Sequence, residues 1–256
     1  MANLSGSGDI LPSIKVVHPA SASQDDWSRV AVERFSRRLL SKTSLFPCIF
    51  GTDALRRGSL RFTFVPAGGE RVGYLADALG EFVEAAPGLG RRTSLVAFFQ
   101  PAEHLEALDD YDRYSWSLLQ AVHDRDPVPW PADIPVDTEH PEWEFCFAGM
   151  PMFVVVNTPA HKRRMSRYFD YLCITFQPRF VFDDITEGSA QGRNARKVIR
   201  ERLNVYDSLP PTPLLGSYGT PGNREWLQYF IGEDNDTPPT EKRCPFRVKG
   251  LYEEGA

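Results

Sequence analysis

Alternating apolar and polar side chains predict the first strand of the chain. In the segment GSLRFTFVP, Leu60, Phe62 and Phe64 alternate with Arg61 and Thr63, which is the two-residue period of a half-buried strand. Four further apolar runs predict strands, over residues 93–99, 144–149, 152–158 and 171–177. Two of the last three runs are almost continuously apolar, a pattern typical of strands buried on both faces.

Helical spacing of apolar residues predicts about five helices. The first should begin near Ser23, and its apolar positions between residues 27 and 39 recur on one face. The others are expected over residues 71–86, 102–124, about 190–205, and 223–232. The stretch FPCIFG, residues 46–51, is expected to be the connection between the first helix and the first strand.

The order of these elements predicts the fold class. Strands and helices do not alternate strictly, which disfavours a doubly wound parallel sheet. We therefore expect an α+β fold with a mixed sheet of about five strands, flanked by about five helices. Residues 1–22 are expected to form a flexible arm, and residues 23–256 a single domain.

Composition and charge narrow the classes of function. The chain has 256 residues, of which 42% are hydrophobic and 12% aromatic, enough to build a core. Its net charge of −5 argues against a nucleic-acid partner, and it has no apolar run long enough to span a membrane. The first residues lack the pattern of a signal peptide, so a cytoplasmic location with reduced cysteines is expected.

Several familiar catalytic patterns are absent from the sequence. It has no phosphate-binding glycine loop, no G-x-S-x-G and no H-E-x-x-H. The four cysteines are widely spaced and form no C-x-x-C pair, which argues against a structural zinc site. Cys146 and Cys173 lie inside apolar strands and are expected in the core.

Cys48 stands in a more distinctive place than the other cysteines. Pro47 stiffens the backbone before it, and Gly51 frees the backbone shortly after it, so a loop would present the thiol in a fixed direction. Four interpretations remain open, namely a buried core thiol, half of a disulfide, a nucleophile and a metal ligand.

His161 is a second candidate ligand. It follows Thr158 and Pro159, which predict the cap and first turn of a short helix at the end of a buried strand. Strand ends and loops are where functional sites collect. A surface histidine beside basic neighbours is the alternative.

Basic residues gather around the same segment. Lys162, Arg163, Arg164 and Arg167 are close in sequence, and Arg179 follows the next strand. Arginine suits carboxylate groups because its fork donates two parallel hydrogen bonds. The cluster is therefore a candidate anion site, with a solvated basic face as the alternative.

Several sequence words together resemble the YqcI/YcgG family. The likeness runs from about residue 46 to 246, and it is carried by FPCIFG, LRFTFV, FFQP, YSWSLLQAVHDRDPVPWPADIP, PEWEFCFAGMPMFVVVNTPAHKRRMSRYFDYLCITFQPRFVFD, LGSYG and EWLQYF. The most specific words are FPC-x-FG, WPADIP and the run from TPAH to FQPR. We identify the chain as resembling this family over most of its length.

This resemblance implies a haem-dependent oxygenase that hydroxylates a nitrogen of a small guanidino or amino-acid substrate, with L-arginine as the first candidate. The chain lacks C-x-x-C-H, so a haem b would be held non-covalently. The reaction needs O2 or peroxide and an electron donor. Cysteine thiolate and histidine are usual haem ligands, and a thiolate favours O–O cleavage, so Cys48 and His161 both stay open as the axial ligand.

The resemblance also suggests roles for other residues. Arg163, Arg167 and Arg179 are candidates for the haem propionates or the substrate carboxylate. Glu144 is a candidate acceptor for a guanidinium, although it could equally be a strand residue that faces water. Phe147 belongs to a set of aromatic residues that would wall a porphyrin pocket, although aromatic strands form ordinary cores more often.

A different class of function also remains open, a carrier or sensor that binds haem or another small ligand without turnover. A homodimer is compatible with the sequence.

Overall fold

The computed structural model describes residues 26–101, 105–186, 188–236 and 242–249. The arm expected over residues 1–22, and the start of the first helix near Ser23, lie outside the described residues. None of the described helices combines the length and the apolar character needed to cross a bilayer.

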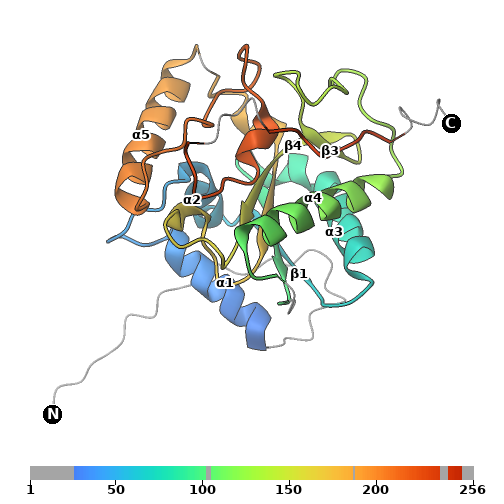
Figure 1. The fold of residues 1–256 in the computed structure, drawn as a ribbon, viewed down its shortest axis with the longest axis horizontal. Coiled ribbons are helices and arrows are strands. Elements are labelled where there is room, and N and C mark those ends of the chain that lie inside the picture. Colours follow the sequence, from blue (N-terminus) through green and yellow to red (C-terminus); the bar gives the residue numbers. More distant parts are fainter. Residues whose placement is uncertain (1–25, 102–104, 187, 237–241, 250–256) are drawn as a thin grey trace.

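A five-stranded mixed sheet forms the centre of the molecule, as the sequence predicts (Figure 1). Its strands stand in the order β1-β2-β5-β4-β3. They comprise β1 (Leu60–Val65), β2 (Ser94–Phe99), β3 (Phe145–Phe147), β4 (Met150–Asn157) and β5 (Cys173–Pro178). β1 and β2 are parallel, and every other pairing is antiparallel. The α+β class with a mixed sheet is confirmed.

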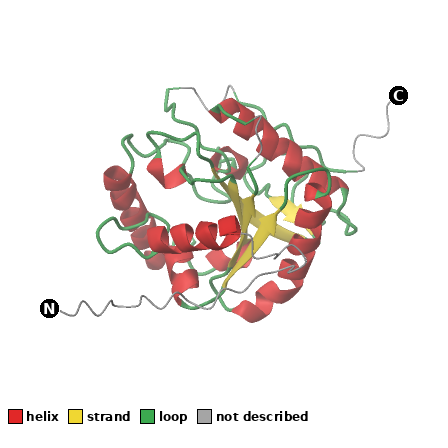
Figure 2. Cartoon of the chain, turned by 90° about the horizontal axis from the view of Figure 1, so that it is seen from below, coloured by secondary structure: helices red, strands yellow, loops and turns green. Residues whose placement is uncertain are grey.

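Within the described ranges, five α-helices flank this sheet (Figures 1 and 2). They are α1 (Asp26–Leu39), α2 (Ile49–Arg56), α3 (Arg71–Ala85), α4 (Leu108–Asp124) and α5 (Ala190–Tyr206). The helix expected from residue 102 begins only at Leu108, because Ala107 before it is extended. The backbone N–H of Ala107 donates to the Asp110 carboxylate at 3.0 Å, and this hydrogen bond caps the start of the helix.

The helices form two layers with separate hydrophobic clusters. α3 and α4 pack against one face of the sheet, where Leu79 and Leu119 meet Ala97 and Val154. α1 and α2 cover the opposite face, where Val32 and other helix residues pack against strand side chains. α5 lies beside α2 on the latter side (Figure 1). Each face of the sheet thus has its own helical cover.

Three local predictions were wrong. FPCIFG is not a simple connection, because α2 begins inside it, at Ile49. The short helix expected at Pro159 does not form either. Instead, the Thr158 hydroxyl accepts from Ala160 N–H at 3.2 Å and closes a turn, and a 3-10 helix follows over Met165–Arg167. Similarly, the final helix is only a 3-10 turn over Glu225–Gln228.

Candidate functional site

A cavity of about 540 Å³ lies on the sheet face that α1 and α2 cover. Its floor consists of strand side chains in register. Val96 of β2 pairs with Thr175 of β5, which pairs with Val155 of β4, and Gln177 pairs with Phe153. β4 was a candidate for burial on both faces, but Phe153 and Val155 are only half-buried because they face the cavity. The volume lies within the range of about 300–1,000 Å³ usual for cofactor and ligand sites.

The other walls of the cavity come from both halves of the chain. α1 and α2 contribute one wall, α5 a second, and the loop and 3-10 turn between residues 212 and 231 a third. Apolar side chains line much of this space, and they are Phe35, Leu39, Phe46, Phe50, Leu60, Phe182, Ile185, Ile199, Leu203, Leu215 and Ile231. The cavity therefore offers an apolar interior with polar groups at particular points.

Cys48 lines this cavity as the N-cap residue of α2. Its Sγ accepts a hydrogen bond from the N–H of Gly51 at 3.3 Å, and a Cβ at that glycine would lie 3.4 Å from the sulfur. Burial raises the pKa of the Cys48 thiol, whereas the N–H groups of Gly51 and Phe50 and the charge of Arg167 oppose that effect. Donors and a cation around a sulfur favour the thiolate, the form that binds a metal.

Arg167 supplies the cationic charge near this sulfur. It lines the cavity at the end of the 3-10 helix Met165–Arg167, and its guanidinium donates to Gln228 O at 3.0 Å. Burial lowers the pKa of Arg167 to about 10, with repulsion from Arg164 adding to the effect. Arg167 consequently stays charged at neutral pH.

Arg179 lines the cavity, and Glu144 binds it from the core side. Its Nε donates to Glu144 Oε2 at 2.6 Å, and its Nη2 forms an ion pair with Oε1 of the same carboxylate. On the other side, the guanidinium lies 3.2 Å from the centre of the Tyr218 ring. Burial lowers the pKa of Arg179, but the Glu144 carboxylate and the aromatic face hold the cation in place.

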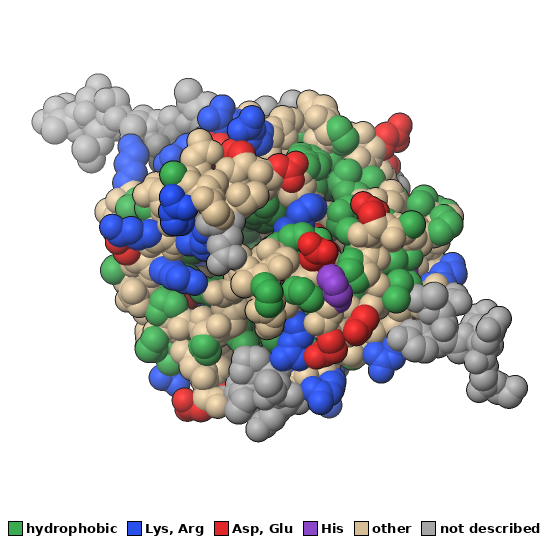
Figure 3. Space-filling model, turned by 90° about the horizontal axis from the view of Figure 1, so that it is seen from above, with side chains coloured by type: hydrophobic (Ala, Val, Ile, Leu, Met, Phe, Trp, Pro, Cys, Tyr) green, Lys and Arg blue, Asp and Glu red, His purple; other side chains and the backbone are tan. Residues whose placement is uncertain are grey.

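Further arginines line the cavity from α5 and from the turn after β4. They are Arg164, Arg196 and Arg200. α5 carries five basic residues and one acidic residue in seventeen, and Figure 3 shows Lys and Arg side chains gathering on the half of the surface where α5 lies in Figure 1. This side of the cavity favours anionic groups.

A polar cluster forms the wall between residues 216 and 228. Asn223 Nδ2 donates to Glu225 Oε1 at 3.2 Å, and Asn223 Oδ1 accepts from Gln228 Nε2 at 3.4 Å. A Cβ at Gly216 would overlap the Asn223 side chain, so only glycine allows this close approach. Glu225 is 5% exposed and lines the cavity. Burial raises the pKa of Glu225 to about 7, against the attraction of Arg179 and the hydrogen bond from Asn223.

The structure separates the predicted site residues into two groups. Cys48, Arg167 and Arg179 line the cavity together. His161, Arg163, Phe147 and Glu144 are not among its lining residues. Phe147 is buried in the hydrophobic cluster on the α3 and α4 side, and Glu144 is fully buried in its pair with Arg179, so it does not face water.

His161 has both ring nitrogens engaged inside the protein. It is fully buried, its Nε2 lies 2.9 Å from Ile231 O, and its Nδ1 lies 3.0 Å from the Thr158 hydroxyl. A carbonyl oxygen can only accept, so Nε2 carries the proton and donates to Ile231 O, while Nδ1 accepts from Thr158. Burial lowers the pKa of His161, which keeps it neutral. This histidine ties the turn after β4 to the C-terminal segment.

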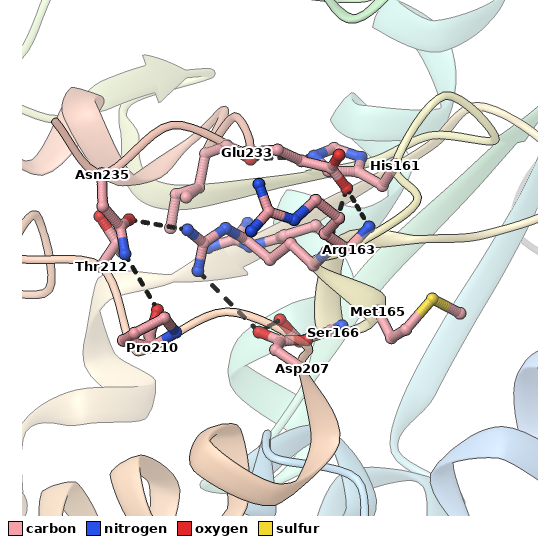
Figure 4. A network of polar contacts seen from close by, with 12 residues as sticks. His161, Arg163, Met165, Ser166, Asp207, Pro210, Thr212, Glu233 and Asn235 are labelled. Atoms are coloured by element: carbon pink, nitrogen blue, oxygen red, sulfur yellow. Dashed lines mark hydrogen bonds and ion pairs between the residues drawn. The ribbon is translucent and has the colours of Figure 1, made fainter. Parts of the chain in front are cut away.

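Arg163 belongs to the same turn, which Figure 4 shows as a network of polar contacts. Its side chain is exposed, and its backbone N–H donates to the Glu233 carboxylate, as does the N–H of Arg164. The Arg164 guanidinium donates to Asn235 Oδ1 at 2.8 Å and lies 4.0 Å from the Asp207 carboxylate. Arg163 and Arg164, two of the five residues in the predicted basic cluster, thus brace one wall of the cavity.

Sequence reasoning missed the contribution of the C-terminal wall. LGSYG entered only through the family resemblance, EWLQYF entered also as part of an expected helix, and nothing in either word marks Glu225 as buried. Asn223 and Gly216 also gave no signal, since both read as ordinary loop residues. One sequence feature could have indicated that Glu225 is buried, namely its place directly before Trp226 and Leu227.

Comparison with known proteins identifies the class to which this fold and cavity belong. The family model of the YqcI/YcgG family matches residues 35–247, and the chain belongs to that family. Every cavity residue named above lies within this match.

Three relatives carry the likeness over most of their length. The uncharacterized proteins YcgG and YqcI of Bacillus subtilis strain 168 are 39% and 38% identical to this chain, each over 89% of it and 91% of the relative. A third protein, from Streptomyces lavendulae, carries the provisional name N(omega)-hydroxy-L-arginine synthase DcsA. It is 34% identical over 88% of this chain and 85% of its own length. No solved structure matches the chain significantly.

Proposed function

We propose that this protein is a haem-dependent oxygenase that hydroxylates a nitrogen of a small guanidino compound, with L-arginine as the first candidate. The observation that carries the proposal is the Cys48 sulfur, which faces a large apolar cavity from the N-terminus of a helix. The printed name of the Streptomyces lavendulae relative supports the reaction and the substrate class.

The residues around the cavity fit an iron porphyrin. Cys48 offers a soft sulfur donor, and binding to iron would deprotonate a thiol whose pKa burial has raised. Apolar side chains from the sheet, α1 and α5 would contact the macrocycle and limit its exposure to water. Arg167, Arg196 and Arg200 line the same space and are suited to carboxylates such as propionates. Haem b, held non-covalently, would supply the activation of O2 or peroxide, with electrons from a separate donor.

The chain's own groups define what the protein contributes to the reaction. Gly51 N–H donates to the Cys48 sulfur and Arg167 is cationic nearby, so the electron density on the sulfur is tuned by a hydrogen bond and a charge. The apolar walls lower the local polarity, and this strengthens the polar contacts that orient a substrate. We assign His161 a positioning role through Thr158 and Ile231, rather than the role of ligand.

The absorption spectrum of the purified protein tests this proposal first. A red protein with a Soret band, which adds one oxygen atom to L-arginine in the presence of reductant and O2, is expected. Protein that stays colourless after incubation with hemin refutes the proposal. Protein that binds haem but releases every substrate unchanged is a carrier or sensor.

Three variants test the ligand assignment. We expect Cys48→Ser to lose the ferrous–CO spectrum of thiolate ligation, while Cys146→Ala, which removes a buried thiol in β3 outside the cavity lining, keeps it. We expect His161→Gln to keep the same spectrum with lower stability. An unchanged spectrum in Cys48→Ser together with an altered one in His161→Gln reverses the assignment.

A further inference from the structure

Glu225 is a buried acidic side chain in the cavity wall, and the proposed reaction as described above gives it no role. Of the two acidic residues that line the cavity, Asp183 is exposed, whereas Glu225 is 5% exposed. A carboxylate in such a place costs free energy unless a cation or several donors compensate it. An ionised Glu225 therefore needs hydrogen-bond donors or a cation around its carboxylate.

Those contacts leave the carboxylate incompletely compensated. The hydrogen bond found for it within the described ranges comes from Asn223, a neutral amide that donates to Oε1 at 3.2 Å. An ionised carboxylate can accept at about four lone-pair sites. Glu225 itself is one of the residues that line the cavity.

The nearby cation is already committed to another acid. Arg179 attracts Glu225 through space, yet its guanidinium is bound at Nε and Nη2 by Glu144 and stacks on Tyr218. The Arg179–Glu144 pair is neutral as a unit. Arg179 is the cation that attracts Glu225, and because Glu144 already balances it, this wall carries one surplus negative charge when Glu225 is ionised.

The loop around Glu225 is built to hold the carboxylate in one orientation. Asn223 is fixed by Gln228 and by its close contact with Gly216, and it in turn fixes Glu225 Oε1. A carboxylate that is held in place and lines the cavity suits a planar cation that donates parallel hydrogen bonds, and a guanidinium is such a group. The arginine-rich α5 wall suits the anionic end of the same molecule or of a cofactor.

We propose that Glu225 is the residue that recognises the cationic end of the substrate, binding its guanidinium inside the cavity, and so determines specificity for guanidino compounds over their neutral isosteres. This inference rests on the proposed function for the identity of the substrate. It assigns the selectivity to a single carboxylate, with Asn223 as the positioning residue behind it.

Ligand binding to the holoprotein tests the inference without any turnover. Dissociation constants for L-arginine and for L-citrulline, its uncharged isostere, are measured by calorimetry and by titration of the absorption spectrum. Three variants are compared with the wild type. Glu225→Gln removes the charge at constant shape, Glu225→Asp keeps the charge, and Glu142→Gln removes an exposed carboxylate outside the cavity lining as a matched control.

We expect the wild type to prefer L-arginine and Glu225→Gln to bind it about 10- to 100-fold more weakly, the range for a lost hydrogen bond to a charged group. L-Citrulline binding should change less than about twofold, since its urea group can pair with an amide as well as with a carboxylate. Glu225→Asp should keep the preference for L-arginine, and Glu142→Gln should change neither constant. Circular dichroism and haem content show that each variant is folded and loaded.

The outcomes separate this inference from the proposed function. If Glu225→Gln binds L-arginine as tightly as the wild type, Glu225 is not the recognition residue, and the oxygenase proposal stands. If the red wild type does not prefer L-arginine, agmatine or methylguanidine over neutral analogues, the inference fails together with the guanidino substrate, while haem binding stands. If the protein stays colourless, the oxygenase proposal fails, and calorimetry with the same cations still decides the role of Glu225.

Discussion

The burial of Glu225 makes a prediction about stability that needs no ligand. The carboxylate lines an apolar cavity, is 5% exposed and has a pKa raised to about 7 by burial. A group whose pKa is higher in the folded than in the unfolded chain binds its proton more tightly when folded. The ionised form of Glu225 therefore destabilises the fold, and Glu225→Gln should relieve this effect while keeping the shape of the side chain.

The size of the effect follows from the two pKa values. The ordinary value of 4.5 and the folded value of about 7 correspond to a difference of about 3 kcal/mol in the free energy of unfolding. Below pH 4.5 the carboxylate is protonated in both states, so the penalty is absent. It grows between pH 4.5 and 7 and is fully present above pH 7. For a domain of this size, about 3 kcal/mol corresponds to roughly 6–12 °C in Tm.

Denaturant unfolding of the ligand-free wild type and of Glu225→Gln, at several pH values between 5 and 8, measures this difference. We expect Glu225→Gln to gain stability relative to the wild type as pH rises, by up to about 3 kcal/mol at pH 8. Glu142→Gln, at an exposed position, should change the stability by no more than about 0.5 kcal/mol. A pH-independent difference for Glu225→Gln contradicts the reasoning, because it means that Glu225 titrates alike in the folded and unfolded chains.

Three further substitutions test the supports of the cavity. Gly216→Ala places a methyl group against Asn223, so we expect about 1–3 kcal/mol lower stability by calorimetry and weaker L-arginine binding; unchanged binding would show that the Asn223 orientation is unimportant. Arg179→Met leaves the Glu144 carboxylate buried and unpaired, which should cost about 3–5 kcal/mol in denaturant unfolding, and adding Glu144→Gln should recover part of the loss. Glu233→Gln weakens the acceptor of three backbone N–H groups and should cost about 1 kcal/mol at pH 7. Burial raises the pKa of Glu233, but those donors bring it below its ordinary value, so the cost should shrink as pH falls through 4.5 and below, and a cost that persists at pH 3 would argue against these bonds.

The sheet could be predicted from the sequence because its strands leave a periodic signal. Residues 60–65 alternate visibly, and the other four strands are short apolar runs bounded by polar or turn residues. α2 could not be predicted in the same way. It has only eight residues, its N-cap is a cysteine, and it contains Gly51 in its first turn. The sequence therefore shows neither the usual capping residue nor a clear helical period at this place.

The candidate site was predictable only where a single residue has an unusual local context. Cys48 stood out because of the proline before it and the glycine after it, and the structure brings it to the cavity. His161 stood out for the same kind of reason, yet both of its ring nitrogens form hydrogen bonds, with the Thr158 hydroxyl and with Ile231 O. The partner at residue 231 is seventy positions away, and such a long-range contact leaves no mark in the local sequence. The same holds for Glu225, whose burial depends on how the C-terminal segment folds back.

The origin of the cavity walls has a consequence for the order of assembly. Its thiol comes from the N-cap of α2, and its acidic wall comes from residues 212–231, which must fold back against β4 before the space is complete. A nascent chain that has not yet released this segment from the ribosome would hold the sulfur in an open groove, accessible to water and to oxidants. Under the proposed function, haem should thus be bound among the last events of biogenesis, and chains halted before residue 212 should emerge without it.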